Sequence, residues 1–225
     1  MPLTPPSLMV WPECDSSMVR GLQGISDQRL VQTFQSDPSV ARSCVALYCR
    51  YIDPVDRLWQ DWAGSPPSAR IWHELWHHLF THLLSPPPSP GSDFPHAEAI
   101  SCPHSVADWM QEQVQAWLHS GIPEHVAAVA DAPEQRKREQ ELAGISPVLT
   151  WYVKAALNRL DPLARFVLLL WDRFGWTKEQ IAAQLQQEGF LIQPEAVVDV
   201  VAQARFACFE QIPLDVRALY LASKP

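Results

Sequence analysis

The chain has 225 residues and a formal net charge of −8, from 17 lysine and arginine residues against 25 aspartate and glutamate residues. A hydrophobic fraction of 47% with 10 tryptophans supplies enough apolar surface for a folded core, which excludes a wholly disordered chain. The acidic balance argues against a free-standing protein that binds nucleic acid by bulk charge, because phosphate neutralisation requires clustered lysine and arginine.

Helical patterns begin after a proline- and serine-rich stretch, residues 1–25, which we expect to form a flexible extension. Ser26 can cap a first helix, which ends before Pro38. An apolar stripe with a period of 3.6 residues then continues from Val40 to Trp62 and predicts one long helix.

Two more helices are predicted before the middle of the chain. Ser68 can cap a helix that runs to about Leu84, and a proline-rich break at 85–103 follows it. Helical spacing resumes around 105–119. Together these helices predict one domain over residues 26–120.

A weakly patterned linker, residues 121–146, leads to a second predicted helical domain, residues 147–225. In this domain Thr177 can cap a short helix, and Pro194 stands where a longer helix would begin. The helix before them carries an apolar stripe of Phe166, Val167, Leu169 and Leu170. No segment shows sustained strand alternation, so we predict an all-α fold of two helical domains, the C-terminal one with a helix-turn-helix.

The five cysteines stand at irregular spacing and form no C-x-x-C pair, which argues against a zinc ribbon or a redox pair. The chain shows no signal-peptide pattern and no apolar run long enough for a membrane span. We therefore expect a cytoplasmic protein without membrane contact, in which the cysteines are reduced: Cys14, Cys44, Cys49, Cys102 and Cys208.

Four segments resemble conserved regions of the sigma-70 family of bacterial RNA polymerase sigma factors, in the order in which the family has them. The segment LDPLARFVLLLWDRFGWTKEQIAAQL, residues 160–185, resembles the fourth conserved region of the compact two-domain members. Residues 30–62 resemble the opening of the family's first domain. SARIWHELWHHLF, residues 68–80, resembles its core-polymerase-binding helix, and SVADWMQEQVQAW, residues 105–117, its promoter-melting helix.

The resemblance implies a transcription initiation factor with no cofactor and no enzymatic activity, whose partners are core RNA polymerase and promoter DNA. An antagonist protein would be a further partner. The implied polymerase contacts are Ile71, Glu74, Trp76 and Phe80. The implied DNA contacts are Trp109, Thr177, Lys178, Gln180 and Arg205.

The departures from the family pattern fall on basic positions that contact DNA. Where the family's recognition helix has lysine or arginine, this chain has Val198, Val200 and Gln203, and Asp199 adds a negative charge. Residues 1–120 hold 6 arginines, no lysine and 12 acidic residues. Because arginine and lysine supply most phosphate and guanine contacts, the sequence predicts weakened promoter binding. A polymerase- or protein-binding adaptor without promoter recognition is therefore the main alternative function.

A minor alternative is a zinc metallopeptidase, because residues 73–77 fit the pattern H-E-x-x-H. On a helix this spacing places His73 and His77 on one face, where both could bind zinc, and Glu74 could activate a zinc-bound water. The third ligand of the extended motif does not follow, because Phe80 stands where that motif has glycine. Glu98 and Glu112 are possible third ligands, but Glu98 lies in the proline-rich break. We therefore expect no metal site.

Overall fold

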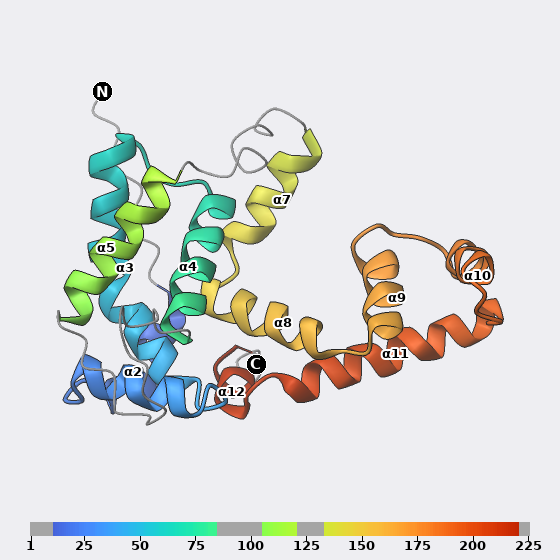
Figure 1. Cartoon of the computed structure of the whole chain (residues 1–225), viewed down its shortest axis with the longest axis horizontal. Coiled ribbons are helices and arrows are strands. Elements are labelled where there is room, and N and C mark those ends of the chain that lie inside the picture. The colour runs from blue at the N-terminus through green and yellow to red at the C-terminus, as the bar shows by residue number, and fades with distance from the viewer. Residues whose placement is uncertain (1–10, 85–104, 121–132, 221–225) are drawn as a thin grey trace, which may run out of the picture. The chain divides into compact units, whose positions relative to one another are not determined.

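The computed structural model describes residues 11–84, 105–120 and 133–220, and all regular structure within these ranges is helical. This confirms the predicted all-α fold (Figure 1). The chain divides into two units, which are described separately: unit 1 comprises Met1–Trp151 with Asp215–Pro225, and unit 2 comprises Tyr152–Leu214.

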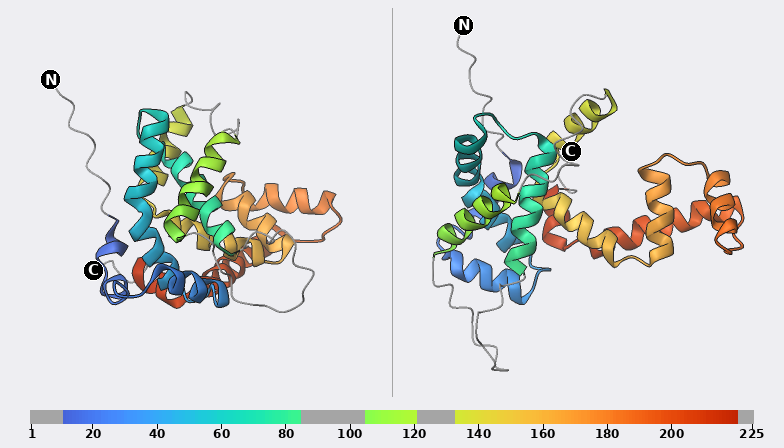
Figure 2. Two further views of the ribbon diagram at one scale, coloured as in Figure 1. Left: turned by 60° about the vertical axis from the view of Figure 1, so that its left-hand side comes forward. Right: turned by 45° about the horizontal axis from the view of Figure 1, so that its top comes forward.

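Unit 1 is built from helices that surround one long helix, α3. Its regular elements are η1 (Pro12–Asp15), α1 (Ser17–Arg20), α2 (Asp27–Ser36), α3 (Arg42–Ala63), α4 (Ala69–Leu84), α5 (Val106–His119), α7 (Pro133–Ala143), the start of α8 (Pro147–Arg159), and α12 (Leu214–Tyr220). Figure 2 shows α3, α4 and α5 close together in both views, and α5 contacts both of the other two.

Capping residues, among them the predicted cap Ser26, explain where these helices begin and end. The Ser26 side chain accepts a hydrogen bond from the Arg29 amide at 3.3 Å and caps α2. Ser105 caps α5 in a reciprocal arrangement with Asp108. Helix α3 ends at Gly64, whose φ of 67° lies in the left-handed region that glycine adopts most readily.

A chain of aromatic rings forms the core of unit 1. Tyr48 on α3 contacts Trp76 on α4 edge-on, with ring centroids 4.6 Å apart. Trp76 contacts Phe80 at 5.3 Å, and Phe80 contacts Trp151 on α8 at 5.9 Å. Because each large ring is buried against another, this cluster fixes the packing of α3 on α4.

Two predicted boundaries in unit 1 differ from the structure. The predicted flexible extension contains η1 and α1 from residue 12 onward, with Trp11 and Val19 buried, so residues 11–25 are an ordered part of the unit. The predicted linker contains α7, which packs on α4. Residues 1–10, the proline-rich break at 85–103 and residues 121–132 lie outside the described residues.

Unit 2 contains the end of α8 together with α9 (Pro162–Asp172), α10 (Lys178–Gln187) and α11 (Pro194–Gln211). Asp161 caps α9 through hydrogen bonds from two amides, and Pro162 occupies the first helical position. Helix α11 contacts both α9 and α10. Its buried side carries Val197, Val201, Ala204 and Cys208.

The C-terminal boundary also differs from the prediction, because α12 belongs to unit 1. The Arg42 amide donates a hydrogen bond to Asp215 Oδ2 at 3.1 Å, and the hydroxyl groups of Ser146 and Tyr220 lie 2.9 Å apart. Both contacts are long-range in sequence, which is why the pattern of residues 147–225 alone did not reveal them. Among the helices of the described ranges, none combines the length and apolar character that a membrane span requires.

Candidate functional site

Helix α4 places the four predicted polymerase contacts on two different faces. Trp76 and Phe80 are both 0% exposed and belong to the aromatic core. Ile71 and Glu74 are half-buried on the other side of the helix. Ile71 and Glu74 therefore keep part of their surface accessible to a partner, whereas Trp76 and Phe80 could act on a partner only by holding α4 in position.

The first histidine of the H-E-x-x-H motif, His73, packs inside unit 1. His73 is buried, and its Nε2 lies 3.2 Å from the Leu142 carbonyl oxygen at the end of α7. A ring nitrogen that donates a hydrogen bond to a carbonyl oxygen has no lone pair for a metal. Across the described part of the chain, no group of three or more histidine, cysteine or acidic side chains could hold a metal ion. The peptidase alternative therefore gains no support from His73 and His77.

A second histidine pair lies one turn further along α4. The rings of His78 and His82 have centroids 3.9 Å apart, and His82 Nδ1 bonds the His78 carbonyl oxygen at 2.9 Å. Burial, followed by the nearby His82 and His77, lowers the pKa of His78 to about 4. The His78 ring is therefore neutral near pH 7.

In unit 2, two of the predicted DNA contacts form a helix cap. The Thr177 side chain accepts a hydrogen bond from the Gln180 amide at 3.3 Å, and Gln180 Oε1 accepts one from the Thr177 amide at 2.9 Å. This reciprocal pair is a capping box that begins α10. Thr177 and Gln180 thus have a structural role that accounts for their residue types.

The two predicted cationic DNA contacts are each paired with a carboxylate. Lys178 Nζ donates a hydrogen bond to Glu195 Oε1 at 3.2 Å, and the Arg205 guanidinium forms an ion pair with Asp172. The carboxylate of Asp172 raises the pKa of Arg205 further. Each pair neutralises a charge that would otherwise be offered to a phosphate.

The surface of α11 is apolar at positions that the resemblance assigns to DNA. Val198 is exposed, and Phe206, which follows the last predicted DNA contact, is 67% exposed. Leu191, in the turn before α11, is 98% exposed. Trp109, the predicted DNA contact on α5, is half-buried, and neither lysine nor arginine lies on that helix. The exposed groups of α11 therefore suit contact with protein better than contact with phosphate.

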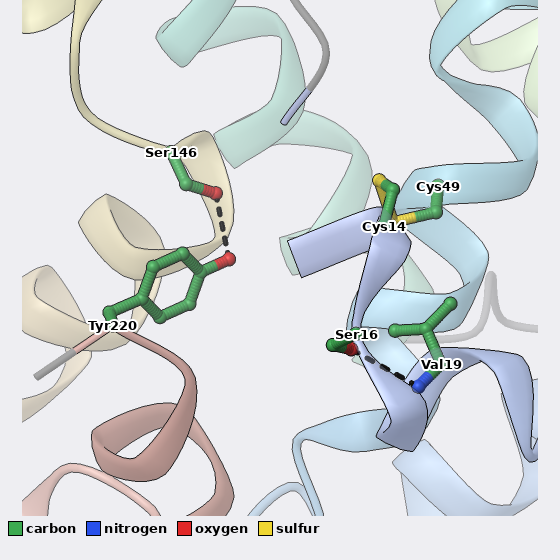
Figure 3. The surroundings of a disulfide bond; sticks show 6 residues. All are labelled: Cys14, Ser16, Val19, Cys49, Ser146 and Tyr220. Carbon is green, nitrogen blue, oxygen red and sulfur yellow. Dashed lines mark hydrogen bonds between the residues drawn. A yellow bond between two sulfur atoms is a disulfide. The ribbon is translucent and has the colours of Figure 1, made fainter. Parts of the chain in front are cut away.

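A disulfide that sequence reasoning missed joins η1 to α3 (Figure 3). Cys14 and Cys49 are bonded across 35 residues, which corrects the prediction that all cysteines are reduced. Closing a loop of this length stabilises the folded state by about 3 to 4 kcal/mol in the chain-entropy model. The only signal in the sequence was the apolar Trp11 and Val19 on either side of Cys14, which indicate that this stretch can pack.

Next to this disulfide, Glu13 is buried with 3% of its surface exposed. Neither of its carboxylate oxygens has a hydrogen-bond partner of ordinary geometry among the described residues. The hydroxyl groups of Tyr48 and Tyr220 lie near enough that Glu13 contributes, after burial, to raising the pKa of each. Leaving a buried polar group without good hydrogen bonds costs about 1 to 3 kcal/mol. The burial of Glu13 therefore works against the packing of η1 on the rest of unit 1.

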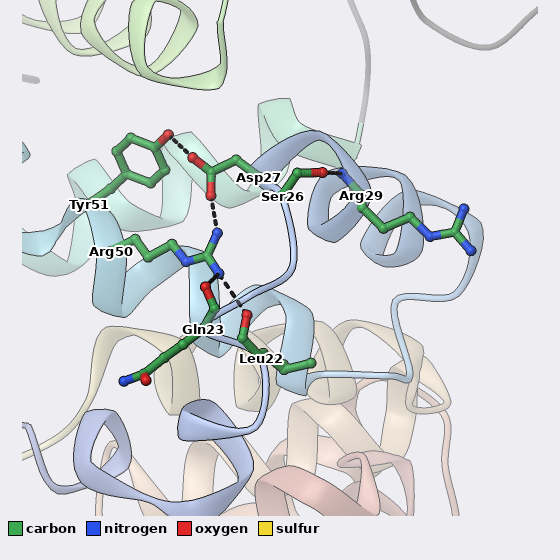
Figure 4. A network of polar contacts seen from close by, with 7 residues as sticks. All are labelled: Leu22, Gln23, Ser26, Asp27, Arg29, Arg50 and Tyr51. Carbon is green, nitrogen blue, oxygen red and sulfur yellow. Dashed lines mark hydrogen bonds and ion pairs between the residues drawn. The ribbon is translucent and has the colours of Figure 1, made fainter.

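A polar network fastens the end of the same N-terminal segment to α3 (Figure 4). Arg50 donates a hydrogen bond to the Leu22 carbonyl oxygen at 2.7 Å and forms an ion pair with Asp27. The Tyr51 hydroxyl donates to Asp27 Oδ2 at 2.6 Å, and burial followed by this contact raises the pKa of Tyr51. Residues 22–27 are thereby attached to α3 independently of the disulfide.

A groove of about 1020 Å³ lies between the second half of α3, the start of α4 and the end of α7. Its wall includes Trp11, Trp72 and His73, together with Asp53 and Asp56 from α3. Burial, followed by the charge of Asp53, raises the pKa of Asp56. The N-terminal segment therefore contributes Trp11 to one wall of this groove.

Comparison with known proteins finds no significant match to a family model, to a curated protein or to a solved structure.

Proposed function

We propose that this chain is a divergent sigma-70-like transcription initiation factor that binds core RNA polymerase. The observation that carries the proposal is the agreement between the family-like segments and the helices. Residues 30–62 coincide with α2 and α3, residues 68–80 lie in α4, and residues 160–185 cover α9 and α10. Gly175, with a φ of 65°, lies in the turn between these two helices, where the family also has glycine.

Polymerase binding would use the accessible face of α4. Ile71 supplies apolar surface there and Glu74 supplies a negative charge. The buried Trp76 and Phe80 would hold this face rigid through their contacts with α3 and α8. Unit 2 would contact the polymerase flap and face upstream DNA, as the resemblance implies.

The adaptor without promoter recognition is favoured by one specific observation. Both cations assigned to DNA, Lys178 and Arg205, are paired with carboxylates, while Val198 and Phe206 are exposed on α11. These groups suit a protein partner, since they offer apolar contact and little net positive charge.

The deciding experiment mixes the full chain with core RNA polymerase and measures two things: co-elution, and promoter opening by permanganate reactivity across a genomic library. Binding with opening that core alone does not produce supports the initiation factor. Binding without opening supports the adaptor, and absence of binding overturns both.

A charge-reversal pair makes the binding test specific to α4. Glu74→Lys is expected to weaken co-elution strongly, because it reverses the charge at the proposed docking face. Glu112→Lys is the control, since it reverses an exposed acid on α5 instead. Equal loss in both variants would point to overall charge and would contradict the assignment of Glu74.

A further inference from the structure

We propose that Cys14–Cys49 is a reversible thiol–disulfide exchange site, at which a dithiol reductant releases η1 and α1 from α3. This modification site does not depend on polymerase binding. Three observations carry it: the disulfide joins a short N-terminal element to a long core helix, the adjacent Glu13 carboxyl group is buried without a hydrogen bond of ordinary geometry to the described residues, and both cysteines are only half-buried.

The exchange reaction is balanced by the dithiol alone. A thiolate of the reductant attacks one sulfur of the disulfide and expels the other as a thiolate, which forms a mixed disulfide. The second thiol of the reductant then closes the reductant's own disulfide and frees the remaining cysteine. Two electrons and two protons pass from the dithiol to Cys14 and Cys49. Partial exposure of both residues gives the reductant access without unfolding of α3.

Once the disulfide is reduced, η1 and α1 are held mainly by the burial of Trp11 and Val19 against the rest of unit 1. The N-cap position of η1 makes no side-chain hydrogen bond, and α1 is only four residues long. Trp11 contacts Tyr48 edge-on at 6.4 Å, which is a modest attraction. The buried Glu13 carboxyl group opposes this contact, because it regains hydrogen bonds to water when η1 leaves.

Release would stop at a defined point. The hydrogen bond from Arg50 to the Leu22 carbonyl oxygen and the Arg50–Asp27 ion pair remain after reduction. The chain from residue 22 onward therefore stays attached, and the freed segment is residues 11–21. Its departure removes Trp11 from the wall of the groove that Trp72 and His73 also line, so reduction enlarges access to that groove.

The test compares hydrogen exchange of the full chain before and after treatment with dithiothreitol, with alkylation and mass spectrometry to show that Cys14 and Cys49 have become thiols. Amides of residues 13–21 are expected to exchange at least about tenfold faster in the reduced protein, while those of α4 and α11 are unchanged. Trypsin cleavage after Arg20 should accelerate, and cleavage after Arg173 in unit 2 should not.

Three variants separate release from general loss of structure. Cys49→Ser should reproduce the fast exchange of the reduced protein without any reductant, and Cys208→Ala, which changes a cysteine in unit 2 that is not disulfide-bonded, should still respond to dithiothreitol. Glu13→Leu keeps the disulfide and removes the buried polar group, so its reduced form should release the segment less than the reduced parent does.

Three outcomes would overturn the proposal. The first is failure of dithiothreitol to reduce the disulfide in the folded protein. The second is complete reduction with amide exchange of residues 13–21 unchanged. The third is an equal acceleration across α4, which would make the disulfide a structural staple of the whole unit.

Discussion

Asp172 and Glu195 each form an ion pair with a cation to which the family resemblance assigns a DNA contact: Asp172 with Arg205, and Glu195 with Lys178. Both pairs are exposed, and exposed ion pairs are weak enough for a phosphate group to compete with them. The carboxylates nevertheless remain beside the cations and repel an approaching phosphate. Arg205 and Lys178 are therefore present, but they do not provide the net positive charge that the resemblance implies for DNA binding.

The double variant Asp172→Asn with Glu195→Gln should bind duplex DNA more tightly than the parent at low salt. It removes the ion pair of Arg205 with Asp172 and, among the described residues, leaves Lys178 only its longer contact of 3.9 Å with Glu179. The slope of log affinity against log salt should steepen by about 0.9 for each cation that gains a phosphate contact. Fluorescence anisotropy with a labelled duplex over a salt series measures both quantities.

Glu188→Gln is the matched control for this measurement. It removes an acid of α10's C-terminal end that bonds Gln184 and no cation. An equal gain of affinity in the control would show that net charge, and not the release of Arg205 and Lys178, produced the effect.

The pH dependence of the free energy of unfolding tests whether His78 is buried in its neutral form. Its pKa is about 4 in the folded protein, below the ordinary value of 6.5, so the unfolded chain binds more protons between these values. The free energy of unfolding should therefore fall as the pH is lowered from about 6.5 to about 4. His78→Gln should flatten this part of the profile in urea denaturation at a series of pH values. An unchanged slope would contradict the burial of a neutral His78.

At the scale of elements, substitutions at the beginning of α10 can distinguish a structural role of Thr177 from a DNA-binding role. Thr177→Ala removes one half of the capping box and should reduce the free energy of unfolding of α10 by about 1 kcal/mol, whereas Thr177→Ser should preserve it. Hydrogen exchange of the α10 amides measures this cost. DNA affinity that falls in both variants would instead assign Thr177 to DNA.

The local signals of the sequence were sufficient for the helices themselves. Ser26, Ser105, Thr177 and Pro194 begin helices in the structure as their residue types predict. Caps act within one turn of the chain, so they can be recognised without knowledge of the fold.

Contacts between elements could not be predicted in this way. The apolar stripe of α9 suggested that Phe166 and Leu169 are buried, yet both are exposed and Leu168 is buried instead. When most positions of a helix are apolar, several of its faces look suitable for burial. Only the element that packs against the helix, here α11, determines which face is buried. The Cys14–Cys49 bond and the place of α12 in unit 1 depend likewise on long-range packing.

The two units of the whole molecule differ in what they present to a partner. Unit 1 buries most of its large aromatic rings, with Trp76 and Phe80 fully buried and Trp62 exposed. Unit 2 leaves large apolar side chains exposed on α9, α11 and the turn between α10 and α11: Phe166, Leu169, Phe190, Leu191, Val198, Phe206 and Phe209. Exposed apolar groups in this number are typical of a surface that binds another protein.

Unit 2 should therefore contribute to polymerase binding through apolar contact on α11. The double variant Val198→Ser with Phe206→Ser should lower the affinity for core RNA polymerase about tenfold or more, because burying two such side chains at an interface supplies well over the roughly 1.4 kcal/mol that a factor of ten requires. Its thermal stability should be nearly unchanged, since both side chains are already exposed. Trp62→Ser is the control, because it removes a large exposed side chain from α3 in unit 1. Reduced promoter opening with polymerase binding intact would assign this face of α11 to DNA, and would favour the initiation factor over the adaptor.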